Sequence, residues 1–214
     1  MTTIPARNGT LLPTIASLLE QTRKPDEIRF YVVPGVDYPA RGLHGAPGVP
    51  LNCVPVDDIG PLTKLSAAVD PELPDDAIIV TVDDDIAYGR TWLETLIAGA
   101  ERNRCEAVGF SGWDVASLIA RNTFRMVRSG RCDVLEGWSG AAYRRGWFEA
   151  GILQPPPEFR CVDDVWISAY LHRRGISRRV IARPLCRPRD EHPGLHNRAD
   201  FRELNRRAAQ LGFA

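Results

Sequence analysis

The sequence predicts an α/β fold in which a mixed, mostly parallel sheet is flanked by helices within a single domain. Residues 11–19 place apolar side chains at helical spacing, and residues 28–33 form an apolar run typical of a strand. A stub of strand within residues 1–7 would complete a strand, helix, strand unit, which implies parallel neighbours. Residues 77–80 are apolar and mostly β-branched, so we expect a strand buried on both faces. The 214 residues are enough for one domain with a large core.

The same patterns place the other elements. Strands are expected at 51–56, 107–110 and 179–182, and helices at 90–103, 163–171 and 201–211, with one more helix entered through Gly60 and Pro61. Pro13 is expected in the first turn of the first helix, where proline is tolerated. Residues 113–130 are assigned to no element. Their arginines, Arg121, Arg125 and Arg128, indicate a basic helix face, the edge of a substrate loop or solvated side chains.

Composition excludes several classes of protein. Basic and acidic residues balance at 27 each, so no overall field favours nucleic acid as a partner. No apolar run reaches the roughly 18–20 residues of a membrane-spanning helix, which leaves peripheral membrane association open. The five cysteines follow no zinc-ligand spacing. Their odd number, without a secretion signal, indicates reduced thiols and a cytoplasmic location.

Three consecutive carboxylates, Asp83, Asp84 and Asp85, follow the predicted strand 77–80. They repel one another and raise each other's pKa unless a cation lies among them. Magnesium and manganese prefer oxygen ligands and complete their coordination with water and substrate phosphates. The triplet therefore predicts a site for a metal-bound diphosphate. The alternative is a solvated acidic turn in which Asp85 caps the following helix.

Lys64 follows the predicted strand 51–56, one turn into the helix that Gly60 and Pro61 open. A helix N-terminus can face an anion, so Lys64 is a candidate to reach a phosphate or ribose. Asp58, just before this turn, supports that interpretation. The alternative is a surface lysine on an amphipathic helix.

A glycine-aromatic segment, Glu136 to Gly140, is a candidate ligand-binding loop. Gly137 and Gly140 permit a sharp bend and a close approach of the backbone to a ligand. Trp138, between them, offers a flat apolar face for a sugar ring. We expect Trp138 to form an exposed ledge, and the alternative is a core tryptophan.

Asp163 and Asp164 begin the predicted helix 163–171, which is apolar over much of its circumference and so should be largely buried. One aspartate is expected to cap the helix and the other to face a cleft, where a carboxylate can accept a proton from a hydroxyl. Both aspartates capping the helix is the alternative. His192 and His196 lie in an irregular stretch, and a histidine near a carboxylate site can add a nitrogen ligand to a metal. His196 is the better candidate of the two.

Together these segments resemble nucleotide-sugar glycosyltransferases of the GT-A fold, in particular those of family 2. The resemblance covers most of residues 2–182 and follows the family's order of motifs. Residues 2–7 with 17–28 resemble the family's opening, 58–64 its bacterial D-x-G-P-x-x-K segment, 83–85 its D-x-D motif, 136–140 its acceptor loop, and 163–164 its E/D-D pair.

The resemblance implies a Rossmann-like GT-A domain spanning residues 1–214, with a nucleotide-sugar-binding half at 1–112 and an acceptor-binding half with a C-terminal helix at 113–214. It implies an inverting transfer from a nucleotide-diphosphate sugar, with UDP-sugar the first expectation, to the hydroxyl of a carbohydrate or lipid-linked glycan. Site residues follow from the matched motifs. The sugar donor would be bound by Thr3, Pro5, Arg7, Asp58, Lys64, Asp83 and Asp84, and Mn²⁺ or Mg²⁺ by Asp85 and Asp83. The acceptor would be bound by Gly137, Trp138, Ser139 and Gly140, and Asp164 would be the base, beside Asp163. His196 lies outside the matched motifs and is added as a metal ligand on its residue type alone.

The chain departs from the family pattern at two places. Met1 falls almost on the family's first strand, so we expect either that the true start lies upstream or that this strand is short. The aspartate that often follows the second strand and recognises the base is not evident in residues 32–35.

Two other functions remain open. One is a metal-dependent nucleotidyltransferase, although no glycine-rich phosphate loop supports it. The other is a non-catalytic sugar-nucleotide-binding protein that keeps the fold without turnover.

Overall fold

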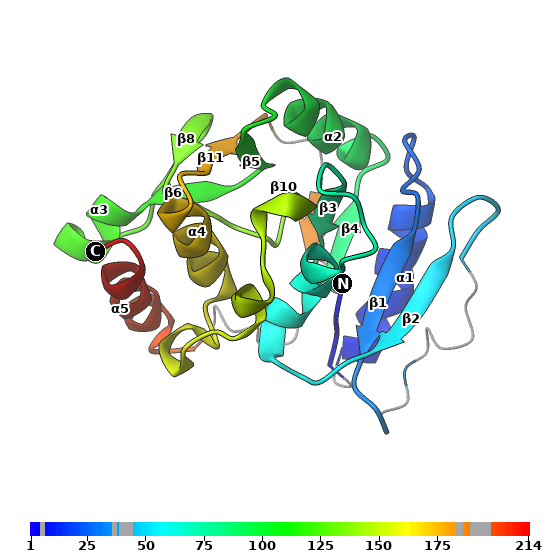
Figure 1. The fold of residues 1–214 in the computed structure, drawn as a ribbon, viewed down its shortest axis with the longest axis horizontal. Coiled ribbons are helices and arrows are strands. Elements are labelled where there is room, and N and C mark those ends of the chain that lie inside the picture. Colours follow the sequence, from blue (N-terminus) through cyan, green and yellow to red (C-terminus); the bar gives the residue numbers. More distant parts are fainter. Residues whose placement is uncertain (5–6, 36–37, 39–44, 183–185, 189–197) are drawn as a thin grey trace.

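The computed structural model describes residues 1–4, 7–35, 38, 45–182, 186–188 and 198–214. Its helices, with η for 3-10 helices, and its strands follow in chain order (Figure 1). They are α1 (Asn8–Leu19), β1 (Ile28–Val32), β2 (Leu51–Pro55), η3 (Gly60–Val69), β3 (Ile78–Thr81), β4 (Ile86–Tyr88), α2 (Trp92–Arg102), β5 (Glu106–Gly109), β6 (Gly112–Asp114), α3 (Val115–Arg121), β7 (Arg125–Met126), β8 (Gly130–Cys132), β9 (Val134–Leu135), β10 (Ala141–Arg144), η4 (Arg145–Trp147), η5 (Ala150–Leu153), η6 (Pro157–Phe159), α4 (Asp163–Arg173), β11 (Ser177–Val180), β12 (Cys186–Pro188) and α5 (Phe201–Gly212).

The N-terminal elements form the expected parallel unit. Thr2 makes a parallel bridge to Tyr31 of β1, which is the predicted stub of strand, and β1 pairs in parallel with β2. Helix α1 connects the stub to β1, and α1, β1 and β2 lie together at the right of Figure 1. One detail was wrong: α1 begins at Asn8, so Pro13 lies inside the helix and not in its first turn. Because proline has no N–H, this turn lacks one helical hydrogen bond.

The largest sheet has the strand order β3-β10-β5-β11-β8. Strand β10 runs antiparallel to both β3 and β5, β11 is parallel to β5, and β8 is antiparallel to β11. Smaller antiparallel sheets pair β12 with β4 and β6 with β7 and β9. The α/β class and single domain are confirmed. A mostly parallel, Rossmann-like sheet is not, because only two of the eight ladders in the described residues are parallel.

Strand β3 separates two hydrophobic clusters. Ile79 belongs to the cluster that includes side chains of η3, α4 and α5, whereas Ile78 and Val80 pack against the cluster that includes side chains of α1, β1 and α2. Successive side chains of a strand point to opposite faces, so β3 contributes to both cores. Both faces thus pack against a core as the sequence predicts, but the face of Ile78 and Val80 is only partly buried.

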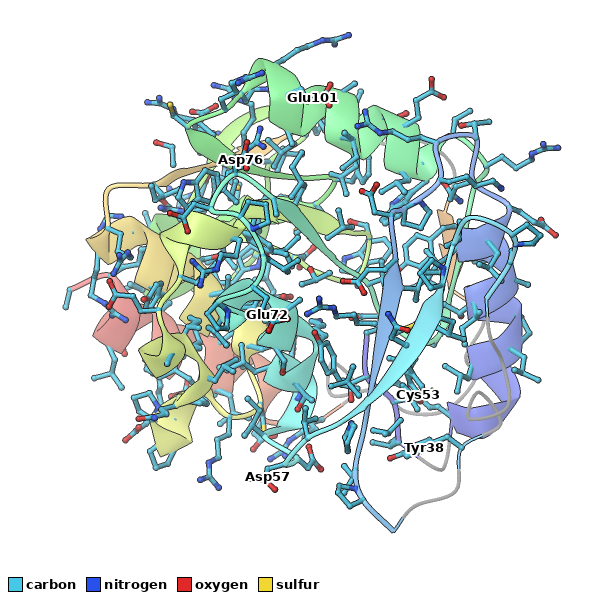
Figure 2. All side chains as sticks on the ribbon, turned by 45° about the vertical axis from the view of Figure 1, so that its right-hand side comes forward. Tyr38, Cys53, Asp57, Glu72, Asp76 and Glu101 are labelled. Carbon is cyan, nitrogen blue, oxygen red and sulfur yellow. The ribbon has the colours of Figure 1, made fainter. Side chains whose placement is uncertain are left out.

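The remaining elements agree with the sequence to different degrees. The helices expected at 90–103, 163–171 and 201–211 are present as α2, α4 and α5. The helix expected after Gly60 is the 3-10 helix η3, which the chain enters beyond Asp57 and leaves before Glu72 (Figure 2). The unassigned stretch 113–130 folds as a short helix among strands of two or three residues. No helix in the described residues is long and apolar enough to cross a membrane.

Candidate functional site

Lys64 lies at the centre of a cluster of carboxylates. The 3-10 helix η3 buries its side chain to 7% exposure, with Nζ 2.7 Å from Asp83 Oδ1 and 3.1 Å from Asp163 Oδ2. The first contact is a hydrogen bond, whereas Asp163 Oδ2 makes only an ion pair, without hydrogen-bond geometry. Burial acts to lower the pKa of Lys64, but the charges of Asp163, Asp83 and Asp164 outweigh it and raise this pKa well above its usual value. The alternative of a surface lysine is therefore wrong.

Asp163 and Asp164 form the first turn of α4 without capping it. The helix begins at Asp163, its N-cap position is Val162, and neither aspartate makes a capping hydrogen bond. The expectation that one of them caps the helix was wrong because each carboxylate has a partner outside α4. Their charges still favour this end of the helix through its dipole.

Asp164 is joined to the glycine-aromatic loop. Its Oδ1 accepts a hydrogen bond of 3.0 Å from the N–H of Gly137. Burial raises the pKa of Asp164 well above the usual range, and the neighbouring Asp163 raises it further, while Lys64 acts in the opposite direction. A carboxylate with a raised pKa is a stronger base, and only part of its side chain is covered.

The three carboxylates of the acidic triplet lie in three different environments. Asp83 faces Lys64, and Asp85 Oδ2 lies 3.4 Å from Arg7 Nη1. Asp84 is buried at 4% exposure, where its carboxylate accepts hydrogen bonds from Thr3 Oγ1 and from Arg7 Nη1. Burial raises the pKa of Asp84, although Thr3 and Arg7 act to lower it. Among the described residues, Thr3 and Arg7 thus fix the buried centre of the triplet.

Asp83 and Asp85 are suited to part of a metal site. They lie on either side of the buried Asp84 and keep 27% and 16% of their side chains exposed. Their hard oxygen atoms are the ligand type that Mg²⁺ and Mn²⁺ prefer, and such ions often use only one or two carboxylates, with water and substrate phosphates in the other positions. No group of three or more acidic, histidine or cysteine side chains in the described part of the chain is arranged to hold a metal by itself.

The glycine-aromatic loop is shaped by two close approaches. Gly140 has φ +103°, and a Cβ there would overlap the indole of Trp92, whose Nε1 donates a 2.7 Å hydrogen bond to the carbonyl of Ser139. A Cβ on Gly137 would lie 3.0 Å from Asp164 Oδ1 and 3.1 Å from Lys64 Nζ. Glycine is therefore needed at position 140, whereas at position 137 a side chain would crowd Asp164 and Lys64. The sharp bend that the sequence predicts is present, with the N–H of Gly140 donating a 2.9 Å hydrogen bond to the carbonyl of Gly137.

Trp138 is more enclosed than expected. Its side chain is partly buried against the cluster of α1, β1 and α2, and its Nε1 donates a 3.1 Å hydrogen bond to Glu136. The expected exposed ledge is therefore only partly exposed, because the indole is hydrogen-bonded to Glu136, whose same carboxylate oxygen also accepts a hydrogen bond from Ser111.

Asp58 has a local structural contact. Asp58 is exposed, and its carboxylate accepts a 2.8 Å hydrogen bond from the N–H of Gly60, which fixes the turn into η3. Pro5 and His196, like His192, lie outside the described residues.

Sequence reasoning missed two side chains that support the site. The hydroxyl of Tyr88 accepts a 3.0 Å hydrogen bond from the N–H of Asp83, and burial raises the pKa of Tyr88 well above its usual value. Thr14 is fully buried, and its Oγ1 donates a 2.9 Å hydrogen bond to the carbonyl of Asp84. A threonine on the apolar face of α1 was the only signal available for the second contact.

Comparison with known proteins adds no assignment. No family model matches the chain, and no match is found among curated proteins.

Proposed function

We propose that the protein is a metal-dependent glycosyltransferase that moves a sugar from a nucleotide-diphosphate sugar to an acceptor hydroxyl, with inversion, in glycan or polysaccharide synthesis. One observation carries the proposal. Segments distant in sequence meet at Lys64, whose Nζ lies 2.7 Å from Asp83 and 3.1 Å from Asp163, while Asp164 accepts the 3.0 Å hydrogen bond of Gly137. These segments are the ones whose motifs resemble the family, and their meeting supports a shared site.

The basic residues account for binding of the sugar donor. Lys64 and Arg7 supply positive charge beside the triplet, where the diphosphate would lie. A Mn²⁺ or Mg²⁺ ion held by Asp83 and Asp85 would neutralise the negative charge that the leaving diphosphate develops. We propose UDP-sugar as the first donor to test.

Asp164 is the proposed base. Its raised pKa makes it able to take the proton of an acceptor hydroxyl, and its hydrogen bond to Gly137 fixes the carboxylate. The acceptor oxygen then forms a bond to the anomeric carbon while the bond from that carbon to the diphosphate breaks. Attack opposite to the leaving group inverts the anomeric configuration. Trp138, beside Gly137 and partly exposed, would contact the acceptor sugar.

The acceptor and the location are proposals too. We propose a carbohydrate or a lipid-linked glycan as acceptor and the cytoplasm as location. Cys105, Cys132 and Cys161 form no disulfide among the residues that the structure describes, which fits a reducing compartment.

Binding of the sugar donor is tested by thermal unfolding with a panel of nucleoside diphosphates, with and without Mn²⁺. A ligand at about 100 times its Kd stabilises by about 2.7 kcal/mol, which raises Tm by roughly 5–10 °C in a chain of this size. We expect a Mn²⁺-dependent rise with one nucleotide that is lost in Asp85→Ala and kept in Asp57→Ala, a matched change at an exposed aspartate. No rise with any nucleotide would contradict the proposal.

Transfer is tested separately with Asp164→Asn. This variant should keep the nucleotide-dependent rise in Tm while transfer to an acceptor glycan falls by about 10²- to 10⁴-fold, the usual contribution of a general base. Full transfer by Asp164→Asn would remove this residue from the role of base. Binding without transfer or hydrolysis in the wild type would instead indicate a sugar-nucleotide-binding protein, and release of pyrophosphate from a nucleoside triphosphate a nucleotidyltransferase.

A further inference from the structure

The stretch from Val115 to Cys132, which we call the basic segment, is strongly charged in one sense. It contains Arg121, Arg125, Arg128 and Arg131 and no aspartate or glutamate. The chain as a whole has a formal net charge of zero, so this local excess of positive charge is not a general property of the protein. An anionic surface would therefore meet this segment preferentially.

The basic segment also exposes apolar side chains. It comprises α3, β7 and β8, and Figure 1 shows α3 and β8 at the left edge of the molecule, opposite α1 and β2. Val115 and Leu118 of α3 are buried, but Ile119 is 38% exposed and Met126 of β7 is 48% exposed. Transfer of such exposed apolar side chains from water into an apolar environment lowers the free energy.

Two of the four arginines of the basic segment stay uncompensated, whereas Arg131 is paired, with its Nε 2.8 Å from Glu106 Oε1. Arg121 and Arg128 are exposed and make no ion pair with any residue that the structure describes. Arg125 approaches Asp114 only to 3.6 Å and keeps 76% of its side chain exposed. Such a surface contact contributes little, so the guanidinium remains available. Exposed arginines and exposed apolar side chains thus occur together within this one short segment.

We propose that the basic segment docks on an anionic lipid bilayer. Ile119 and Met126 would enter the boundary between headgroups and acyl chains, and Arg121 and Arg128 would lie among the anionic headgroups. A polyanion such as RNA would use the arginines alone, whereas a membrane uses the apolar side chains as well, and the exposure of Ile119 and Met126 favours the membrane. This inference does not depend on the glycosyltransferase proposal.

Vesicle co-sedimentation tests the proposal. Wild-type protein should bind vesicles of equal parts phosphatidylcholine and phosphatidylglycerol and should not bind phosphatidylcholine alone. Arg121→Ala/Arg128→Ala should bind about 30-fold more weakly, since each arginine near an anionic surface contributes about 1 kcal/mol. The matched control is Arg102→Ala/Arg104→Ala, which removes two exposed arginines at the end of α2 and should bind like wild type.

A second variant separates lipid insertion from charge attraction. Ile119→Ser/Met126→Ser keeps every arginine and should also weaken binding, by about tenfold, as apolar contact with the bilayer is lost. All variants change exposed side chains, so unchanged thermal unfolding is expected and verifies the fold. The proposal is overturned if wild type ignores the anionic vesicles, if both arginine pairs lose binding equally, or if Ile119→Ser/Met126→Ser binds like wild type, which would indicate a polyanion site.

Discussion

Replacing Lys64 by methionine tests the charge balance at the centre of the site. Methionine keeps the length and most of the volume of the side chain but removes the ammonium. Asp83 and Asp163 then lose the cation that lies 2.7 Å and 3.1 Å away. Their carboxylates would face one another, and Asp164, with no buried positive charge between them.

The size of the effect follows from burial. Removing one partner of a buried ion pair typically costs about 3–5 kcal/mol, because the other charge stays buried and unpaired. The Asp163 side chain is only 11% exposed, so its charge cannot be hydrated, whereas Asp83 at 27% is partly hydrated. We therefore expect about 3 kcal/mol, the lower end of the range. At roughly 2–4 °C per kcal/mol for this chain length, Tm should fall by about 6–12 °C.

The pH dependence gives a second signature. Burial already raises the pKa of Asp164 in the folded state, and without Lys64 the charge that opposes this rise is gone, so the pKa of Asp164 rises further above its value in the unfolded chain. The folded state then binds more protons than the unfolded state, so the free energy of unfolding falls as pH rises. The difference in free energy of unfolding between wild type and Lys64→Met should consequently shrink when the pH is lowered from about 7.5 to about 5.5.

Urea unfolding of wild type and variant at both pH values measures the two effects. Lys24→Met is the matched control, since Lys24 is exposed and is the only other lysine of the chain. It should change stability by less than about 0.5 kcal/mol at either pH. Equal stability of the two methionine variants, or a deficit that stays constant with pH, would refute the role assigned to Lys64.

Three further outcomes are expected. Gly140→Ala should lower Tm strongly in thermal unfolding, because the residue has φ +103° and a Cβ would overlap the Trp92 ring. The control Gly151→Ala should leave Tm unchanged, because the space around Gly151 is open. Thr14→Val, which preserves shape, should cost about 1–3 kcal/mol in urea unfolding because it leaves a buried carbonyl without its hydrogen bond; no loss would show that water replaces the hydroxyl. The Asp164 carboxyl should titrate by NMR above the usual aspartate range and stabilise less as pH rises through its pKa; an ordinary pKa would contradict the burial argument.

Periodicity predicted the long elements because their side chains divide cleanly between core and solvent. In α2, Trp92, Leu96 and Ala100 are buried at helical spacing, as the sequence indicates. The basic segment carries no such signal, since strands of two or three residues are too short to show alternation. Their pairing depends on partners distant in sequence, which no local pattern reveals.

The sequence motifs indicated which segments form the candidate site, but they did not indicate which partner each side chain contacts. Asp83, Asp84 and Asp85 are chemically identical and adjacent, yet the middle one is buried under Thr3 and Arg7. That arrangement requires the first residues of the chain to cross the end of β3. Likewise, nothing local distinguishes Asp163, which pairs with Lys64, from Asp164, which pairs with Gly137.

The choice of lysine at position 64 has a steric reason, and it yields a last prediction. A Cβ on Gly137 would already lie 3.1 Å from Lys64 Nζ, so the loop passes close to the ammonium, and the lysine side chain is only 7% exposed. The planar guanidinium of an arginine is larger than this compact charge and would press on the loop. Lys64→Arg should therefore be less stable than wild type by about 1–3 kcal/mol, the usual cost of overpacking, although the charge is kept. The loss of unfolding free energy of Lys64→Arg relative to wild type, measured in urea, should stay nearly constant with pH because the carboxylates still have a cation. Lys64→Met should differ in this respect. A deficit that shrinks at lower pH would mean that the guanidinium does not reach them.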